Sequence, residues 1–191
     1  GDNQEVVTMK YPRNKMKAVQ KGLTLVELML VLAVIAIIIA IGVGAYVITN
    51  SGAKAYGVSS DMMSLNAAVK TLYQNGTYTS IDAQTVAKTG KVPANMVDGS
   101  GNLKGKWGGT LTLAPTSVGS GTDNAFQVTY PNIPRRECND MAATLAPIFD
   151  IVKVGTTTVK DRTAATPITF DAGTAATACD NDSNTFEMTA T

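Results

Sequence analysis

The sequence predicts an α+β fold, in which one long N-terminal helix packs on a globular head with an antiparallel β-sheet. No proline lies between Pro12 and Pro93, so nothing in that stretch forbids a continuous helix. Beyond Trp107, short segments alternate between apolar and polar residues and are separated by glycine, proline and asparagine, which is typical of strands joined by turns. A helix followed by such strands indicates α+β architecture rather than a parallel α/β sheet.

The helix begins with an apolar run, Leu28 to Ile48, which contains 21 residues and no charge. At about 1.5 Å per residue this run would be roughly 31 Å long, enough to cross the hydrocarbon of a bilayer. We therefore assign residues 23–50 to a membrane segment. Residues 1–22 carry five basic side chains against two acidic ones, which predicts a cytoplasmic N-terminus and a translocated head. An ordinary single-pass signal anchor is the alternative interpretation of this run.

Glu27 stands directly before the apolar run. A carboxylate in this place loses water when the helix is buried, at a cost of several kcal/mol unless it is protonated or paired, so we expect a specific partner. Ala36, Ala40 and Gly44 recur at a spacing of four, which places small side chains on one helix face and lets helices approach closely. Small residues are also common in membrane helices, so this pattern alone leaves both interpretations open.

An amphipathic stripe continues the helix to about Tyr73, where Asn75-Gly76 is expected to end it. We predict that the stripe packs in the core of a single head domain, residues 51–191. Its members are Val58, Met62, Leu65, Val69 and Leu72.

The head is expected to contain short helices and strands in alternation. The first two strands should pair as a hairpin, the second ending before Pro131. The predicted helices are 82–89, 139–146 and 171–179, and the predicted strands are 107–113, 125–130, 149–154, 156–160 and 185–189.

The composition argues against catalysis. The chain contains no histidine, which removes Ser-His-Asp and Cys-His arrangements, and it has no phosphate-binding glycine loop. We expect no enzyme activity, no cofactor and no metal. The net charge is +1, and we expect no nucleic-acid partner. Arg135-Arg136 is interpreted as a solvated pair or a subunit salt bridge, and Asp180 with Asp182 as a solvated turn rather than a calcium site.

Cys138 and Cys179 lie on the exported side of the predicted membrane segment, where a disulfide can persist. Such a bond would close about 40 residues, worth roughly 4 kcal/mol in the chain-entropy model. Two reduced thiols acting as metal ligands are the alternative, which the absence of histidine disfavours.

The stretch Lys-Gly-Leu-Thr-Leu-Val-Glu at 21–27, followed by an aliphatic helix, resembles the class III signal of type IV prepilins. The resemblance implies a pilin fold, a leader peptide at 1–22, cleavage between Gly22 and Leu23 by prepilin peptidase, and N-methylation of Leu23. Glu27 would become the fifth mature residue, where the family carries a glutamate. Leucine at the first mature position and the long leader look like the type IVb branch. The region 138–179 resembles the family's disulfide-bounded loop.

The resemblance implies a structural role, as the major pilin precursor of a filament that assembles as a homo-oligomer. The precursor would wait in the bacterial inner membrane and end in an extracellular pilus. A pilus assembly ATPase and a platform protein are implied as indirect partners. Such fibres serve adhesion, aggregation, conjugation or motility, and the sequence does not choose among them, although it looks most like major type IVb pilins, including those of conjugative thin pili. A minor or tip pilin that binds a receptor, a type II secretion pseudopilin and, remotely, a tethered enzyme are the alternatives.

Overall fold

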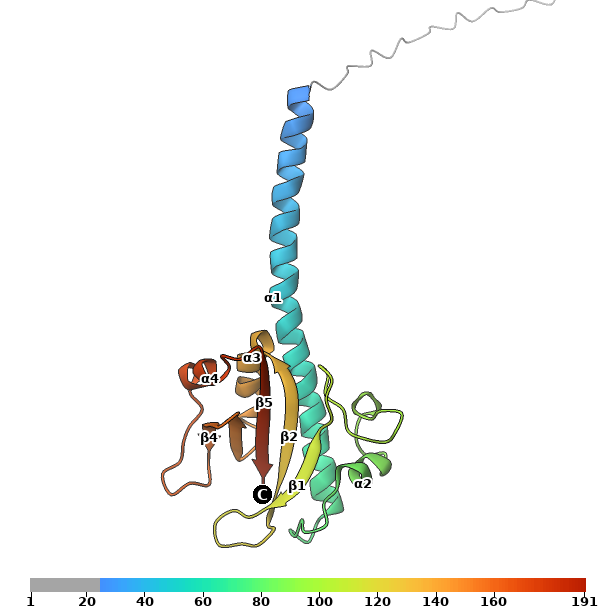
Figure 1. Cartoon of the computed structure of the whole chain (residues 1–191), viewed down its shortest axis with the longest axis vertical. Helices are drawn as coiled ribbons and strands as arrows, with labels where there is room; N and C mark the ends of the chain where they lie inside the picture. Colours follow the sequence, from blue (N-terminus) through green and yellow to red (C-terminus); the bar gives the residue numbers. More distant parts are fainter. Residues whose placement is uncertain (1–24) are drawn as a thin grey trace, which may run out of the picture. The chain divides into compact units, whose positions relative to one another are not determined.

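The computed structural model describes residues 25–191, and the side chains of residues 40–52 lie outside the described part. The chain divides into two compact units, Gly1–Val43 and Gly44–Thr191, and helix α1 contributes residues to both. Figure 1 shows the elements, whose bounds are α1 Leu25–Leu72, α2 Ala83–Lys88, the 3₁₀ turn η1 Ala94–Met96, β1 Thr112–Thr116, β2 Ala125–Pro134, α3 Arg135–Leu145, β3 Ile151–Val154, β4 Thr157–Asp161, α4 Ala172–Ala178 and β5 Ser183–Ala190.

Helix α1 confirms the long helix that the sequence predicts. Four members of the amphipathic stripe, from Val58 to Val69, are fully buried, but Leu72 is 36% exposed, so its assignment to the core was wrong. The helix ends at Leu72, and the next residue, Tyr73, packs against the core instead, with its ring 5.8 Å from that of Tyr78. Gly76 then turns the chain at a φ of +68°, a conformation that favours glycine.

The head contains one antiparallel sheet with the strand order β1-β2-β5-β3-β4 (Figure 1). Its central strands β2 and β5 direct alternate side chains into the same hydrophobic core as the buried face of α1. Because helix and sheet share this core, residues 53–72 of α1 are part of the head. The buried side chains of the two strands include Phe126, Val128, Tyr130, Phe186 and Met188.

Strand β2 passes through Pro131 and ends at Pro134, whereas the sequence predicted an end before Pro131. The register against β5 shifts by one residue between Tyr130 and Ile133, which identifies a β-bulge. Asn132 occupies the bulge at a φ of +63°, a conformation that asparagine tolerates better than most residues. The bulge explains how a strand can continue past a residue that has no N–H.

Strand β1 begins at Thr112, five residues later than the predicted start at Trp107. Gly108 and Gly109 have φ values of +84° and +80°, so they form a turn, and the Trp107 ring packs 6.1 Å from that of Tyr130. β1 is an edge strand that pairs only with β2, which is why it tolerates Pro115. The predicted hairpin of these two strands is confirmed, with Thr112 opposite Thr129.

The short helices begin where the sequence places helix-initiating residues. Asp82 caps α2 by accepting a hydrogen bond from the Thr85 N–H at 2.9 Å, and Asp171 caps α4 through the Thr174 N–H at 2.7 Å. The bond from the Thr174 N–H, with one from its hydroxyl, lowers the pKa of the Asp171 carboxyl. Helix α3 begins at Arg135, earlier than the predicted 139, because Pro134 precedes it with a φ of −64° that suits a helix entry.

Candidate assembly site

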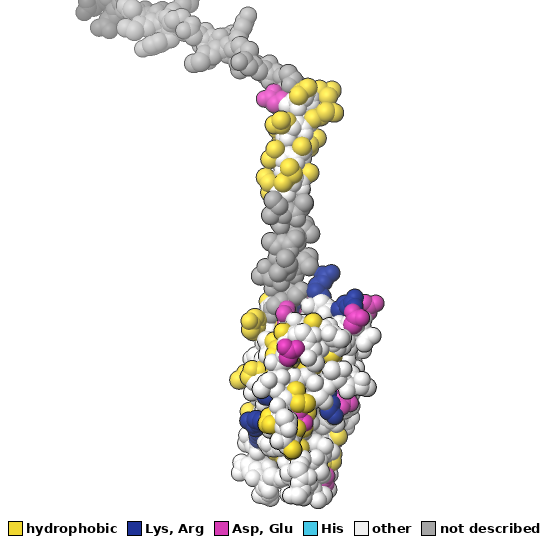
Figure 2. Space-filling view, turned by 90° about the vertical axis from the view of Figure 1, so that its left-hand side faces the viewer, with side chains coloured by type: hydrophobic (Ala, Val, Ile, Leu, Met, Phe, Trp, Pro, Cys, Tyr) yellow, Lys and Arg dark blue, Asp and Glu magenta, His cyan; other side chains and the backbone are white. Residues whose placement is uncertain are grey.

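The first described part of α1, residues 25–39, presents an apolar surface on every face. Its large hydrophobic side chains are between 45% and 73% exposed. Figure 2 shows hydrophobic side chains along this segment on the face in view. A helix that is apolar all round is normally covered by lipid or by other protein. This segment is therefore the strongest candidate for an assembly surface.

Glu27 is the only charged residue in this segment. It occupies the first turn of α1, where a carboxylate interacts favourably with the positive end of the helix dipole. Within the segment, its side chain is the one that can form an ion pair with a cation.

The other predicted site residues of this region are only partly described. Gly22 and Leu23, the predicted cleavage and methylation residues, lie outside the described residues. Ala36 is exposed on α1. Ala40 and Gly44 belong to the same helix, but their surroundings lie outside the described part, so the predicted face of small residues stays a prediction.

In the part of the chain whose side chains are described, no helix has the combined length and apolar character that crossing a membrane requires. The predicted membrane run, Leu28 to Ile48, extends into residues 40–52, which are outside that part.

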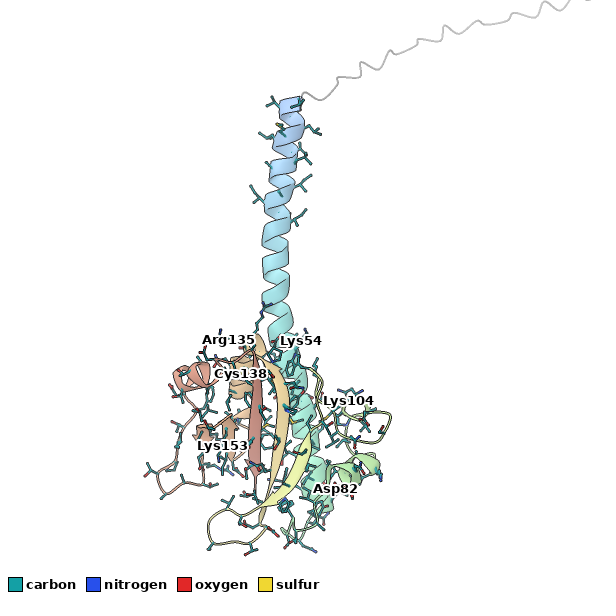
Figure 3. The ribbon with its side chains drawn as sticks, in the orientation of Figure 1. Lys54, Asp82, Lys104, Arg135, Cys138 and Lys153 are labelled. Carbon is teal, nitrogen blue, oxygen red and sulfur yellow. A yellow bond between two sulfur atoms is a disulfide. The ribbon has the colours of Figure 1, made fainter. Side chains whose placement is uncertain are left out.

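A disulfide joins Cys138 in α3 to Cys179 at the end of α4, with 5.7 Å between their Cα atoms. Both cysteines are buried in the core. Arg135, one turn before Cys138, forms an ion pair with Asp180, the residue after Cys179. Figure 3 labels Arg135 and Cys138 at the same end of the head. The pair thus lies beside the disulfide, between α3 and the residue that follows the cap of α4. Its side chains are 54% and 78% exposed, so it contributes little to stability.

A cluster of polar side chains lies beside strands β3 and β4, and no pattern in the sequence predicts it. Asp150 forms an ion pair with Arg162 and accepts two hydrogen bonds from Thr191. Nearby, the Lys160 ammonium donates to the carbonyl oxygens of Ala146 and Phe149, which follow the end of α3. Burial, and then repulsion from Arg162, lowers the pKa of Lys160 against the attraction of Asp150. The cluster joins residues that are distant in sequence, so no local pattern reveals it.

A cavity of about 500 Å³ with a mixed polar and apolar lining lies beside α1 in the head. Its apolar lining includes Met62 and Met96, and its polar lining includes Asp61 and Lys104, the latter labelled in Figure 3. Tyr130 also lines this cavity, and its hydroxyl accepts a hydrogen bond of 2.7 Å from the Lys106 N–H. Burial raises the pKa of Tyr130, with the Lys106 bond opposing and Asp61 adding to the effect.

The family model described as "PilS N terminal" matches residues 52–191, and the model of the prokaryotic N-terminal methylation motif matches residues 17–43. No curated protein matches the chain.

Two similar solved structures are both type IV pilins. TcpA from the Vibrio cholerae El Tor biotype has a TM-score of 0.56 and 14% identity, over 74% of this chain and 99% of TcpA. The type IVb pilin from Salmonella typhi has a TM-score of 0.50 and 20% identity, over 69% of this chain and 97% of that one. At such identities the likeness shows the fold, a helix packed on an antiparallel sheet. Because the PilS model matches more than half of the residues and a methylation motif precedes it, the chain belongs to the PilS family of type IV pilins.

Proposed function

We propose that this chain is the major subunit precursor of a type IVb pilus. The observation that carries the proposal is the apolar surface of residues 25–39, which surrounds the helix and includes a single carboxylate, Glu27. A surface of this kind is stable in a bilayer or in the core of a fibre, and it can move between them by exchanging lipid for other helices.

Processing would convert the precursor into the assembling form. Prepilin peptidase would cut between Gly22 and Leu23, remove the basic leader 1–22, and leave an amino group on Leu23 that is then N-methylated. The methylation motif at 17–43 supports this step. Until then the precursor would remain in the bacterial inner membrane, with the N-terminus in the cytoplasm, residues 23–50 in the bilayer and the head, 51–191, in the periplasm.

The new amino group of Leu23 gives Glu27 of a neighbouring subunit a cationic partner. Burying an amine and a carboxylate together costs less than burying either alone, because each offsets the desolvation of the other. The face formed by Ala36, Ala40 and Gly44 would let neighbouring helices approach closely in the fibre.

The remaining partners follow from membership of the family rather than from residues of this chain. An assembly ATPase and a platform protein would drive the extraction of the subunit and its polymerisation into an extracellular filament. The likeness to the Salmonella typhi pilin supports the type IVb assignment. Such a filament would serve adhesion, aggregation or conjugation.

Mass spectrometry of filaments sheared from cells tests the proposal. We expect an abundant protein that starts at methylated Leu23 and has Cys138 bonded to Cys179. Filament protein that starts upstream of Leu23 would overturn the proposed processing.

A minor or tip pilin with a receptor-binding role is the second candidate. The cavity beside α1 favours it, because Asp61, Lys104 and Tyr130 bring polar groups to an apolar floor, a combination typical of ligand sites. Copy number separates the two candidates, since a tip subunit would be a trace component of the sheared filaments. A type II secretion pseudopilin would instead be retained entirely in the periplasm.

A further inference from the structure

The head carries a shallow groove between α1 and α3 that the fold does not fill. It consists of two adjoining hollows of about 210 and 550 Å³, which share Thr144 as a lining residue. The α1 residues that line it recur at spacings of three and four, so they form one helix face, distinct from the face in the core. They include Tyr56, Ser59, Met63, Asn66 and Lys70.

Two side chains of the groove are in an unfavourable environment in the isolated head. Met63 is 57% exposed, although its neighbour Met62 is fully buried. The side-chain Oδ1 of Asn66 is buried and has no hydrogen-bond donor among the described residues. An apolar contact from another molecule would improve the environment of Met63.

A complementary feature lies at the other side of the head. Among the described residues, Ile168 is the one exposed large hydrophobic side chain that does not belong to α1, and it is 44% exposed. Figure 1 shows the segment between β4 and α4, which carries it, at the left-hand margin of the head and away from α1.

The backbone holds Ile168 in this exposed position. Its N–H donates to the Asp161 carbonyl at 2.8 Å, and its own carbonyl accepts from the Asp161 N–H at 2.9 Å. The Asp161 side chain also accepts hydrogen bonds from the Thr163 and Ala164 N–H groups. A side chain that is fixed before binding loses little conformational entropy on docking.

The charges at the ends of the segment complement those of the groove. Arg162, which pairs with Asp150 but keeps an exposed side chain, and exposed Asp171 flank the segment. Exposed Asp140 and Lys70 stand at opposite ends of the groove. Neither Asp140 nor Lys70 forms an ion pair within the described part of the chain.

We propose that the groove between α1 and α3 receives the Ile168 segment of a second copy of this chain. The groove and the segment lie on different parts of one head, so the contact is heterologous, which is the kind of contact from which an open filament can be built. This inference rests on the proposed function, because the contact would hold neighbouring heads together in the fibre.

Cysteine cross-linking in assembled filaments tests the contact. We expect the double variant Met63→Cys, Ile168→Cys to give a ladder of disulfide-linked multimers when sheared filaments are mildly oxidised and run on a non-reducing gel. The matched control is Leu72→Cys, Ile168→Cys, because Leu72 is also an exposed apolar residue of α1 but does not line the groove. Each single variant controls for exchange with the native disulfide.

Filaments that form but give no ladder, or the same ladder in the control, would overturn the docking contact and leave the proposed function intact. A wild-type chain that forms no filament would instead overturn the proposed function. If the double variant fails to assemble, co-expression of the two single variants places the cysteines on neighbouring heads. A cross-linked dimer then supports the contact, and its absence in mixed filaments overturns it.

Discussion

The Asp150 carboxylate binds Thr191 through two hydrogen bonds, at 2.9 Å from the backbone N and at 2.8 Å from the hydroxyl oxygen. Asp150 follows α3 and Thr191 follows β5, so these bonds fasten the end of a central strand to the turn that precedes β3. The carboxylate side chain is only 8% exposed, which makes its partners important.

We predict that Asp150→Ala lowers the free energy of unfolding by about 2–4 kcal/mol, because it removes two hydrogen bonds to a charged acceptor and leaves their donors without it. The ion pair with Arg162 adds little, since that side chain is 68% exposed. Urea unfolding of the full chain in detergent, followed by circular dichroism, measures the change. Asp182→Ala, at an exposed turn, is the control and should stay within about 0.5 kcal/mol of wild type.

Tyr130 predicts how stability depends on alkaline pH. Burial raises the pKa of its hydroxyl above the usual value of 10.0, so the folded state keeps a proton that the unfolded state releases. This contribution is therefore fully present below pH 10.0 and is lost as the pH rises through the folded pKa. Tyr130→Phe should be less stable near neutral pH, having lost the Lys106 bond, but should lose less stability above pH 10. Parallel losses in both proteins, seen in urea midpoints across this range, would contradict the assignment.

Loss of the disulfide should destabilise the head substantially. The bond closes a loop with a sequence separation of 41 residues, and the chain-entropy model gives about 4 kcal/mol for a loop of this size. A Cys138→Ala, Cys179→Ala variant should thus melt well below wild type in a thermal scan. A reducing agent should lower the melting temperature of the wild type and leave that of the variant unchanged. If the reducing agent also lowered the melting temperature of the variant, its effect would not come from this disulfide.

The proposed cleavage site predicts a dependence on side-chain size at Gly22. Gly22→Ala should preserve much of the processing, whereas Gly22→Phe should block it, because the peptidase must approach the backbone closely at the scissile bond. The lengths of the products on a gel, from cells with and without prepilin peptidase, report the outcome. Mature-length protein from Gly22→Phe would refute this requirement.

Glu27 should be needed for assembly and not for insertion or cleavage. Glu27→Val and Glu27→Gln should both reach the membrane and be processed. Each should give at least about tenfold less filament than wild type, which corresponds to a loss of about 1.4 kcal/mol or more in the free energy of assembly. The Gln variant keeps the size of the side chain without its charge, so it separates shape from electrostatics. Ile38→Val is the control within the same segment. Normal yield from Glu27→Gln, without wild-type subunits present, would exclude an ion pair.

The long helix was predictable because its causes are local: no proline interrupts it, and the stripe from Val58 to Val69 keeps the helical period. The boundaries of β1 and β2 could not be predicted in the same way. They depend on the positive φ values of Gly109 and Asn132, which arise where the chain turns or bulges in the sheet. Neighbouring residues alone do not set these conformations.

The processing motif at 21–27 is likewise a local signal, which a peptidase would read from an extended stretch of chain. Two other features are tertiary: the cluster of Asp150, Arg162 and Thr191, and the groove between α1 and α3 that Met63 lines. They form only when β3, β4, β5 and the helices come together. Sequence patterns therefore identify the likeness to pilins and leave the head surface to the structure.

Pro115 in β1 affects how this protein can aggregate, because we expect many copies of the chain to lie next to one another. β1 is an edge strand of the sheet, and a flat edge strand can pair with a strand of another molecule. A residue with no amide hydrogen interrupts the template that amyloid growth requires. Such a chain can be crowded at very high local concentration while its association remains directed by helices.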